Sequence, residues 1–265
     1  MNLPLAVLLL VQGAAGASPP APPAPRADRA ELRFGLDTLY GGAFATAARY
    51  FADLSARDSG DPAPIIFHAG ALIWWAAARD SDDFDSAAID SLLDRAIALA
   101  RAAPPGAERD FWLGTAIGYR ARERELHGHA WSAAKDAKAM RDAYGRVLAA
   151  DSSCIDCWLG LGLYSYGLAR ASAIARFVAR LIGLGSGDAA EGIGMLRRAA
   201  SGGDLARVEA TWVLAAALSR EAARDDQHRA ALRSESVSLV DGLAQRYPGN
   251  PVFQRFLTEM TDSSP

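Results

Sequence analysis

Apolar residues recur at intervals of three and four along almost the whole chain, which is the period of amphipathic α-helices. Short turns rich in glycine, proline and aspartate separate these segments, as at Gly41–Gly42 and Pro104–Gly106. The pattern predicts an all-α chain. The predicted helices lie near residues 32–39, 44–54, 65–78, 86–103, 107–126, 130–150, 155–169, 170–185, 188–200, 204–218, 229–246 and 253–257.

The stretch 151–167, DSSCIDCWLGLGLYSYG, is the most ambiguous part of this pattern. Its leucines alternate with aromatic residues and glycines, as they would in a strand. Helical segments flank it on both sides, and Asp151 with the two serines after it can cap a helix, so we predict a helix over 155–169. A glycine inside a helix costs about 0.5–1 kcal/mol relative to alanine. We therefore expect Gly160, Gly162 and Gly167 to lie where a neighbouring helix approaches closely.

The N-terminal residues predict export. Residues 1–17 read as a signal peptide, with an apolar run followed by small residues and an Ala15-x-Ala17 cleavage site, although no lysine or arginine precedes the run. Ser18 follows the cleavage site, so no cysteine is placed there to carry a lipid anchor. Residues 18–26 form a linker rich in proline and alanine, 27–261 the helical domain, and 262–265 a tail. We expect a periplasmic or cell-envelope protein that is not lipid-anchored.

Charge excludes one class of partner. The 265 residues include 28 basic and 31 acidic side chains, which are interspersed and give a net charge of −3. Because no basic stripe or run occurs, we do not expect nucleic acid to be a ligand.

The spacing of aromatic residues and glycines resembles the tetratricopeptide repeat (TPR). Trp158, Leu161 and Gly162 match the start of that pattern, and the segment from Gly35 to Phe51 is similar to it. Residues 27–257 also resemble exported bacterial TPR-like proteins of no assigned activity. The matching stretches are FWLGTAIGYRAR, DCWLGLGLYSYG, GDAAEGIGMLRRAASGG and RYPGNPVF.

This resemblance implies antiparallel helix pairs stacked as an α-solenoid, with a short C-terminal capping helix. Trp112 and Trp158 are 46 residues apart, and Trp158 and Trp212 are 54 apart, so the repeats are longer than the usual 34. The resemblance implies binding of a protein or peptide partner in the concave groove, and it implies no catalytic residue.

In TPR arrays, the positions one, five and eight after the aromatic of a repeat tend to face the groove. The resemblance therefore implies an apolar and aromatic groove, with Arg120 and Arg220 as isolated cations suited to acidic groups of a peptide. The alternative is that these side chains are buried against neighbouring helices, which leaves no open groove. The predicted groove residues are Phe67, Trp74, Arg120, Leu159, Leu163, Tyr166 and Arg220.

Cys154 and Cys157 are the two cysteines of the chain. In an exported protein they are candidates for a disulfide across a helix start, or for a redox pair at a helix N-terminus. Trp158 follows them, which excludes haem attachment through Cys-x-x-Cys-His, and no second cysteine pair completes a zinc site. We favour a structural role.

No acid–base pair, triad or metal-ligand set stands out elsewhere, so we expect a non-enzymatic protein with neither cofactor nor metal. Two alternatives stay open. One is an exported redox or other enzyme that uses Cys154 and Cys157. The other is an envelope protein that contacts the membrane surface through the amphipathic segment 170–184, which carries arginines beside an apolar stripe. Neither the partner nor the oligomeric state follows from the sequence.

Overall fold

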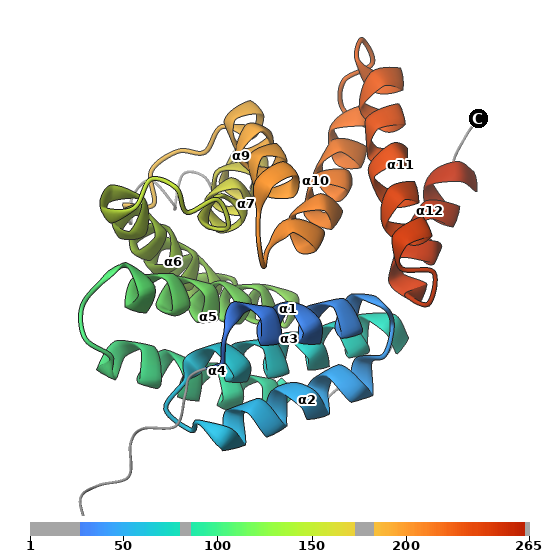
Figure 1. The fold of residues 1–265 in the computed structure, drawn as a ribbon. Coiled ribbons are helices and arrows are strands. Elements are labelled where there is room, and N and C mark those ends of the chain that lie inside the picture. The colour runs from blue at the N-terminus through green and yellow to red at the C-terminus, as the bar shows by residue number, and fades with distance from the viewer. Residues whose placement is uncertain (1–26, 80–85, 173–182, 263–265) are drawn as a thin grey trace, which may run out of the picture.

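Every regular element of the computed structural model, which describes residues 27–79, 86–172 and 183–262, is an α-helix (Figure 1). The predicted all-α class is therefore confirmed for these residues. The helices are α1 (Arg29–Tyr40), α2 (Phe44–Arg57), α3 (Pro62–Arg79), α4 (Ser86–Ala102), α5 (Ala107–Leu126), α6 (Ala130–Ala150), α7 (Cys157–Arg170), α9 (Ala189–Gly202), α10 (Arg207–Ala222), α11 (Arg229–Arg246) and α12 (Pro251–Asp262).

Local signals place most helix ends where the sequence predicts them. Asp28 caps α1 in a capping box with Glu31, and Asp188 caps α9. The start of α3 differs from the prediction: the helix was expected from residue 65, but it begins at Pro62. The Asp61 side chain accepts a hydrogen bond from the N–H of Ala63, and proline suits the first position of a helix because its missing N–H would have no partner there.

Neighbouring helices along the chain pack as pairs, and glycines allow the closest approaches. A Cβ atom at Gly162 of α7 would lie 2.9 Å from the carbonyl oxygen of Gly192 in α9. A Cβ at Gly160 would lie 2.4 Å from the ring of Tyr144 in α6. No atom lies within 4 Å of a Cβ placed at Gly167. The expected close packing thus holds for the first two glycines and was wrong for Gly167.

The last helix pair returns to contact the first (Figure 1). Asn250, in the turn before α12, donates from Nδ2 to the carbonyl oxygen of Tyr40 at 3.0 Å. In the same turn, the backbone of Gly249 lies against Gly42, whose φ of 90° and lack of a side chain permit the contact. Arg255 of α12 donates to the carbonyl oxygen of Ala78 at 2.8 Å. Residues more than 170 positions apart in sequence therefore hold the two ends together.

Aromatic side chains fill the interior between these ends. Trp74 of α3 packs edge-on against Tyr40 of α1, with ring centroids 5.5 Å apart, and against Phe253 of α12 at 5.6 Å. Trp212 of α10 lies 6.3 Å from Trp74. One hydrophobic cluster thus joins the N-terminal helices to α10 and α12.

Several expectations fall on residues outside the described ranges. These are the signal peptide at 1–17, the linker at 18–26, most of the amphipathic segment 170–184 and most of the tail. Among the described helices, none combines the length and hydrophobicity needed to cross a bilayer.

The α7–α9 contact predicts opposite effects for the same substitution at two glycines of one helix. Gly162→Ala should lower the free energy of unfolding by about 1–3 kcal/mol, because the new Cβ is forced against backbone and Leu196. Gly167→Ala should raise it by about 0.5–1 kcal/mol, because no atom obstructs the Cβ and alanine favours the helix. Urea unfolding of the two variants measures both effects. Equal effects would contradict close packing through Gly162.

Candidate functional site

A cleft of about 100 Å³ lies between α5, α7 and α10 and is the candidate site. Its walls are mainly aromatic and aliphatic, with a few polar groups. The residues lining this cleft are Phe67 of α3; Phe111, Thr115, Gly118, Tyr119 and Arg122 of α5; Met140 and Tyr144 of α6; Asp156, Leu159, Gly160 and Leu163 at or in α7; and Leu205, Ala206 and Glu209 at or in α10.

Glu209 is the central polar group of the cleft. It lies in the first turn of α10, and its Oε2 accepts a hydrogen bond of 2.7 Å from the Tyr119 hydroxyl. Burial raises the pKa of Glu209 above the ordinary glutamate value, although the Tyr119 hydrogen bond and the charge of Arg122 oppose this shift. Burial also raises the pKa of Tyr119 well above its usual range, and the nearby Glu209 adds to that shift. The pair therefore places a carboxyl group with a raised pKa among apolar side chains.

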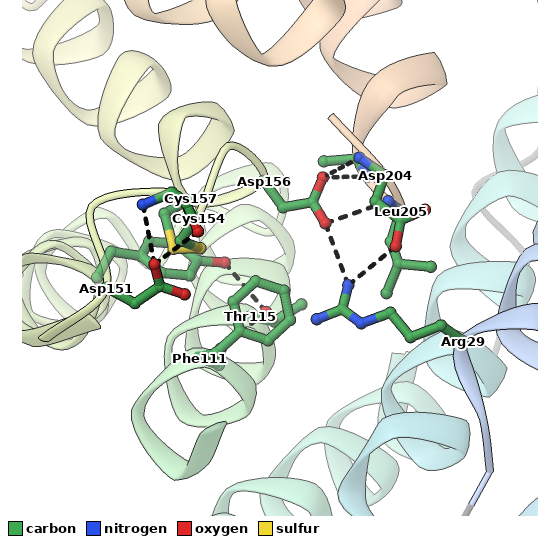
Figure 2. The surroundings of a disulfide bond; sticks show 12 residues. Arg29, Phe111, Thr115, Asp151, Cys154, Asp156, Cys157, Asp204 and Leu205 are labelled. Atoms are coloured by element: carbon green, nitrogen blue, oxygen red, sulfur yellow. Dashed lines mark hydrogen bonds and ion pairs between the residues drawn. A yellow bond between two sulfur atoms is a disulfide. The ribbon is translucent and has the colours of Figure 1, made fainter. Parts of the chain in front are cut away.

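Asp156 fixes the N-terminal end of α10 against α7 (Figure 2). Its Oδ1 accepts from the backbone N–H of Asp204 at 2.7 Å and of Ala206 at 3.2 Å, and its Oδ2 accepts from that of Leu205 at 3.1 Å. These N–H groups lie at the positive end of the α10 dipole, where a carboxylate is favourable. Arg29 of α1 reaches the same carboxylate, with Nη1 3.4 Å from Oδ2. One buried side chain thus connects α1, α7 and α10.

The structure joins Cys154 to Cys157 by a disulfide bond at the start of α7 (Figure 2). Asp156 lies between the two cysteines in sequence, so the bond closes the turn that carries this carboxylate. Cys157 is fully buried, which removes its sulfur from attack by soluble thiols. This geometry fits the structural role better than the redox role that the sequence left open.

Three of the seven predicted groove residues line the cleft: Phe67, Leu159 and Leu163. Leu163 is 42% exposed and lies at the rim. Trp74 is buried in the aromatic interior, away from the cleft lining. Tyr166 is also buried, and its hydroxyl donates to Glu221 at 2.9 Å.

The two arginines were expected to supply isolated cations to the groove, and for Arg120 this was wrong. Arg120 binds the carboxylate of Asp136 through Nε at 2.9 Å and Nη2 at 2.8 Å, and its Nη1 lies 2.6 Å from Asp94. The guanidinium is therefore neutralised between α4, α5 and α6. Arg220 is exposed at the end of α10 and is not part of the cleft lining.

Glu209 was not among the residues predicted to line a binding site. A glutamate in the first turn of a helix is explained by the helix dipole alone, so the sequence carries no signal that sets this one apart. Tyr119 lies in the stretch FWLGTAIGYRAR, which was matched only to the TPR-like resemblance. Its hydrogen bond to Glu209 joins residues 90 positions apart, which local spacing does not encode.

Metal binding has no support in the described part of the chain, where no three histidine, cysteine or acidic side chains gather as a ligand set. Comparisons with protein-family models, curated proteins and solved structures find no match. The cleft is therefore interpreted from its own geometry.

The hydrogen bonds of Asp156 predict a large loss of stability when its charge is removed. Asp156→Asn should lower the free energy of unfolding by about 1.5–3 kcal/mol, because the backbone N–H groups before α10 lose a charged acceptor. Asp204→Asn is the matched control. Asp204 pairs at the surface with Arg33 and Arg29, so its loss should cost about 0–1 kcal/mol. Chemical denaturation of both variants checks this order, and equal losses would contradict it.

Glu209 predicts a specific pH dependence of stability. A raised folded-state pKa means that its contribution to stability is fully present below the ordinary glutamate pKa of about 4.3 and is lost as the pH rises through the folded-state value. Relative to Glu209→Gln, the wild-type protein should therefore lose free energy of unfolding as the pH rises above about 4. Glu125→Gln, an exposed change on α5, should follow the wild type. Parallel wild-type and Glu209→Gln curves from urea unfolding across this range would refute the assignment.

Proposed function

We propose that this chain is a non-enzymatic, exported, TPR-like helical-repeat protein that binds a protein or peptide partner in the cleft between α5, α7 and α10. The observation that carries the proposal is the cleft itself: apolar walls, an exposed leucine at the rim and the half-buried carboxyl group of Glu209. Concave apolar sites with a few convergent polar groups are typical of ligand-binding sites.

Because the interior is filled, we favour a partner that inserts one side chain into the cleft. A partner that lies along a long open groove is less consistent with this packing. Phe67 and Trp112 pack edge-on at 6.1 Å, and Arg29 of α1 covers the Trp112 ring at 6.0 Å. These contacts occupy the inner surface that an open TPR array would offer to an extended peptide. The cleft is the apolar opening beside this filled region, so the partner's contribution there is a single side chain or a short apolar segment.

Export is proposed from the N-terminal sequence, and the disulfide agrees with an oxidising compartment. The fully buried Cys157 and the structural use of the turn around Asp156 favour a binding protein over a thiol–disulfide enzyme.

Two exposed leucines test the proposal. Leu163 lies at the cleft rim, whereas Leu126 is 66% exposed at the end of α5 and lies outside the cleft. The mature protein, Leu163→Asp and Leu126→Asp would each be cross-linked to the native envelope fraction and the products compared. We expect the wild type and Leu126→Asp to capture the same partner and Leu163→Asp to lose it, because a charge at the rim opposes burial of an apolar group.

Thermal unfolding of both aspartate variants checks that neither has lost its fold. A partner retained by Leu163→Asp, or lost equally in both variants, would place binding outside the cleft and overturn the proposal.

A further inference from the structure

Glu209 is the one charged group of the cleft that has no ionic partner among the described residues. Asp156 is matched by Arg29 and by three backbone N–H groups. Arg122 pairs with Glu123, at 3.2 Å between Nη1 and Oε1. Glu209 receives a hydrogen bond from a neutral phenol, on Oε2. Within the described chain its Oε1 has no hydrogen-bond partner, so this oxygen is available to a ligand.

The chemistry around this oxygen defines the complementary ligand. The walls formed by Phe67, Leu159 and Leu163 suit an aliphatic chain. A wholly apolar ligand would displace water from the carboxyl group without replacing its hydrogen bonds, which is unfavourable. An anion would be repelled by Glu209 once that residue is ionised. A cationic donor at the end of an aliphatic stem satisfies both parts of the cleft.

We infer that the cleft recognises a primary ammonium group on an aliphatic stem, which in a protein partner is a lysine side chain, and that Glu209 binds the ammonium. This inference rests on the proposed function and names the chemistry of the partner. An ammonium is a compact point charge, whereas a guanidinium needs a planar set of acceptors. The cleft of about 100 Å³ offers a single free carboxyl oxygen, which suits the ammonium. The residue that the partner inserts is therefore expected to be basic. The sequence, in contrast, predicted a peptide with acidic groups, on the basis of Arg120 and Arg220.

Three probes of equal chain length separate the parts of this inference: n-butylamine, 1-butanol and butyrate. Each probe has four carbon atoms, and the end group is cationic, neutral or anionic. Each would be titrated into ¹⁵N-labelled mature protein near neutral pH, with binding followed at the amides of α5, α7 and α10. We expect butylammonium to bind roughly tenfold more tightly than butanol. This ratio is expected if the ion pair with Glu209 adds about as much binding free energy as one hydrogen bond.

Glu209→Gln should bring the amine and alcohol affinities within about twofold of each other, because the amide keeps the shape but loses the charge. Glu125→Gln, exposed and outside the cleft, should retain the preference for the amine. Arg122→Gln keeps Glu209 and removes the neighbouring cation, so at a pH high enough to ionise Glu209 in both proteins it should strengthen amine binding even if Glu209→Gln does not fold. Weaker amine binding in Arg122→Gln would overturn the inference.

The remaining outcomes distinguish this inference from the proposed function. Equal binding of amine and alcohol at the cleft would overturn the role of Glu209 and leave an apolar binding cleft in place. Tighter binding of butyrate would also overturn it, since Arg122 would then be the recognising residue. If no probe shifts the cleft amides, the inference fails, and the Leu163 and Leu126 cross-linking comparison decides the proposed function independently.

Discussion

The carboxylate of Asp156 is the interaction on which the geometry of the cleft depends. It accepts hydrogen bonds from three consecutive backbone N–H groups before α10, and it also pairs with Arg29 of α1. Without an acceptor these N–H groups would be buried next to the start of a helix with no partner. Because Glu209 lies in the first turn of α10, the position of that turn relative to α5 sets the distance between Glu209 and Tyr119. The disulfide beside Asp156 constrains the same turn, so a local covalent bond contributes to a contact between distant helices.

For Glu209, stability conflicts with the recognition role that we propose. Burial favours its neutral form, and the Tyr119 hydroxyl compensates only part of the lost hydration. An alanine or leucine at this position would pack against the same walls without that cost. A group that opposes stability while lining a cleft is typical of functional sites, where local rules of folding are broken for the sake of a ligand. The buried acids Asp136 and Asp110 differ from Glu209, since each binds two arginines.

Helix positions could be predicted from the sequence because local chemistry determines them. The bounds of α5, α6 and α11 follow from the glycines, prolines and polar turns that flank them. Leu159 and Leu163, predicted as groove residues, both line the cleft, because residues four apart on a helix lie on the same face. The counting rule failed at Arg120, because its partner Asp136 lies on the next helix and its exposure depends on how α5 and α6 pack. Glu209 could not have been predicted, since its environment consists of residues contributed by α5 and α7.

Contact between the two chain ends changes what the helical array can bind. In an open array the inner surface is continuous, and an extended peptide can contact several repeats at once. Here the turn before α12 bonds to Tyr40, and Trp74 is enclosed by rings from α1, α10 and α12. The aromatic residues that would line such a surface instead stabilise the closed arrangement. Under the proposed function, recognition is then confined to a small cleft, where a single side chain must supply much of the binding energy. In so small a site one unpaired carboxyl group has a large influence on ligand choice. Glu209, rather than the predicted aromatic groove, is therefore the group expected to select the ligand.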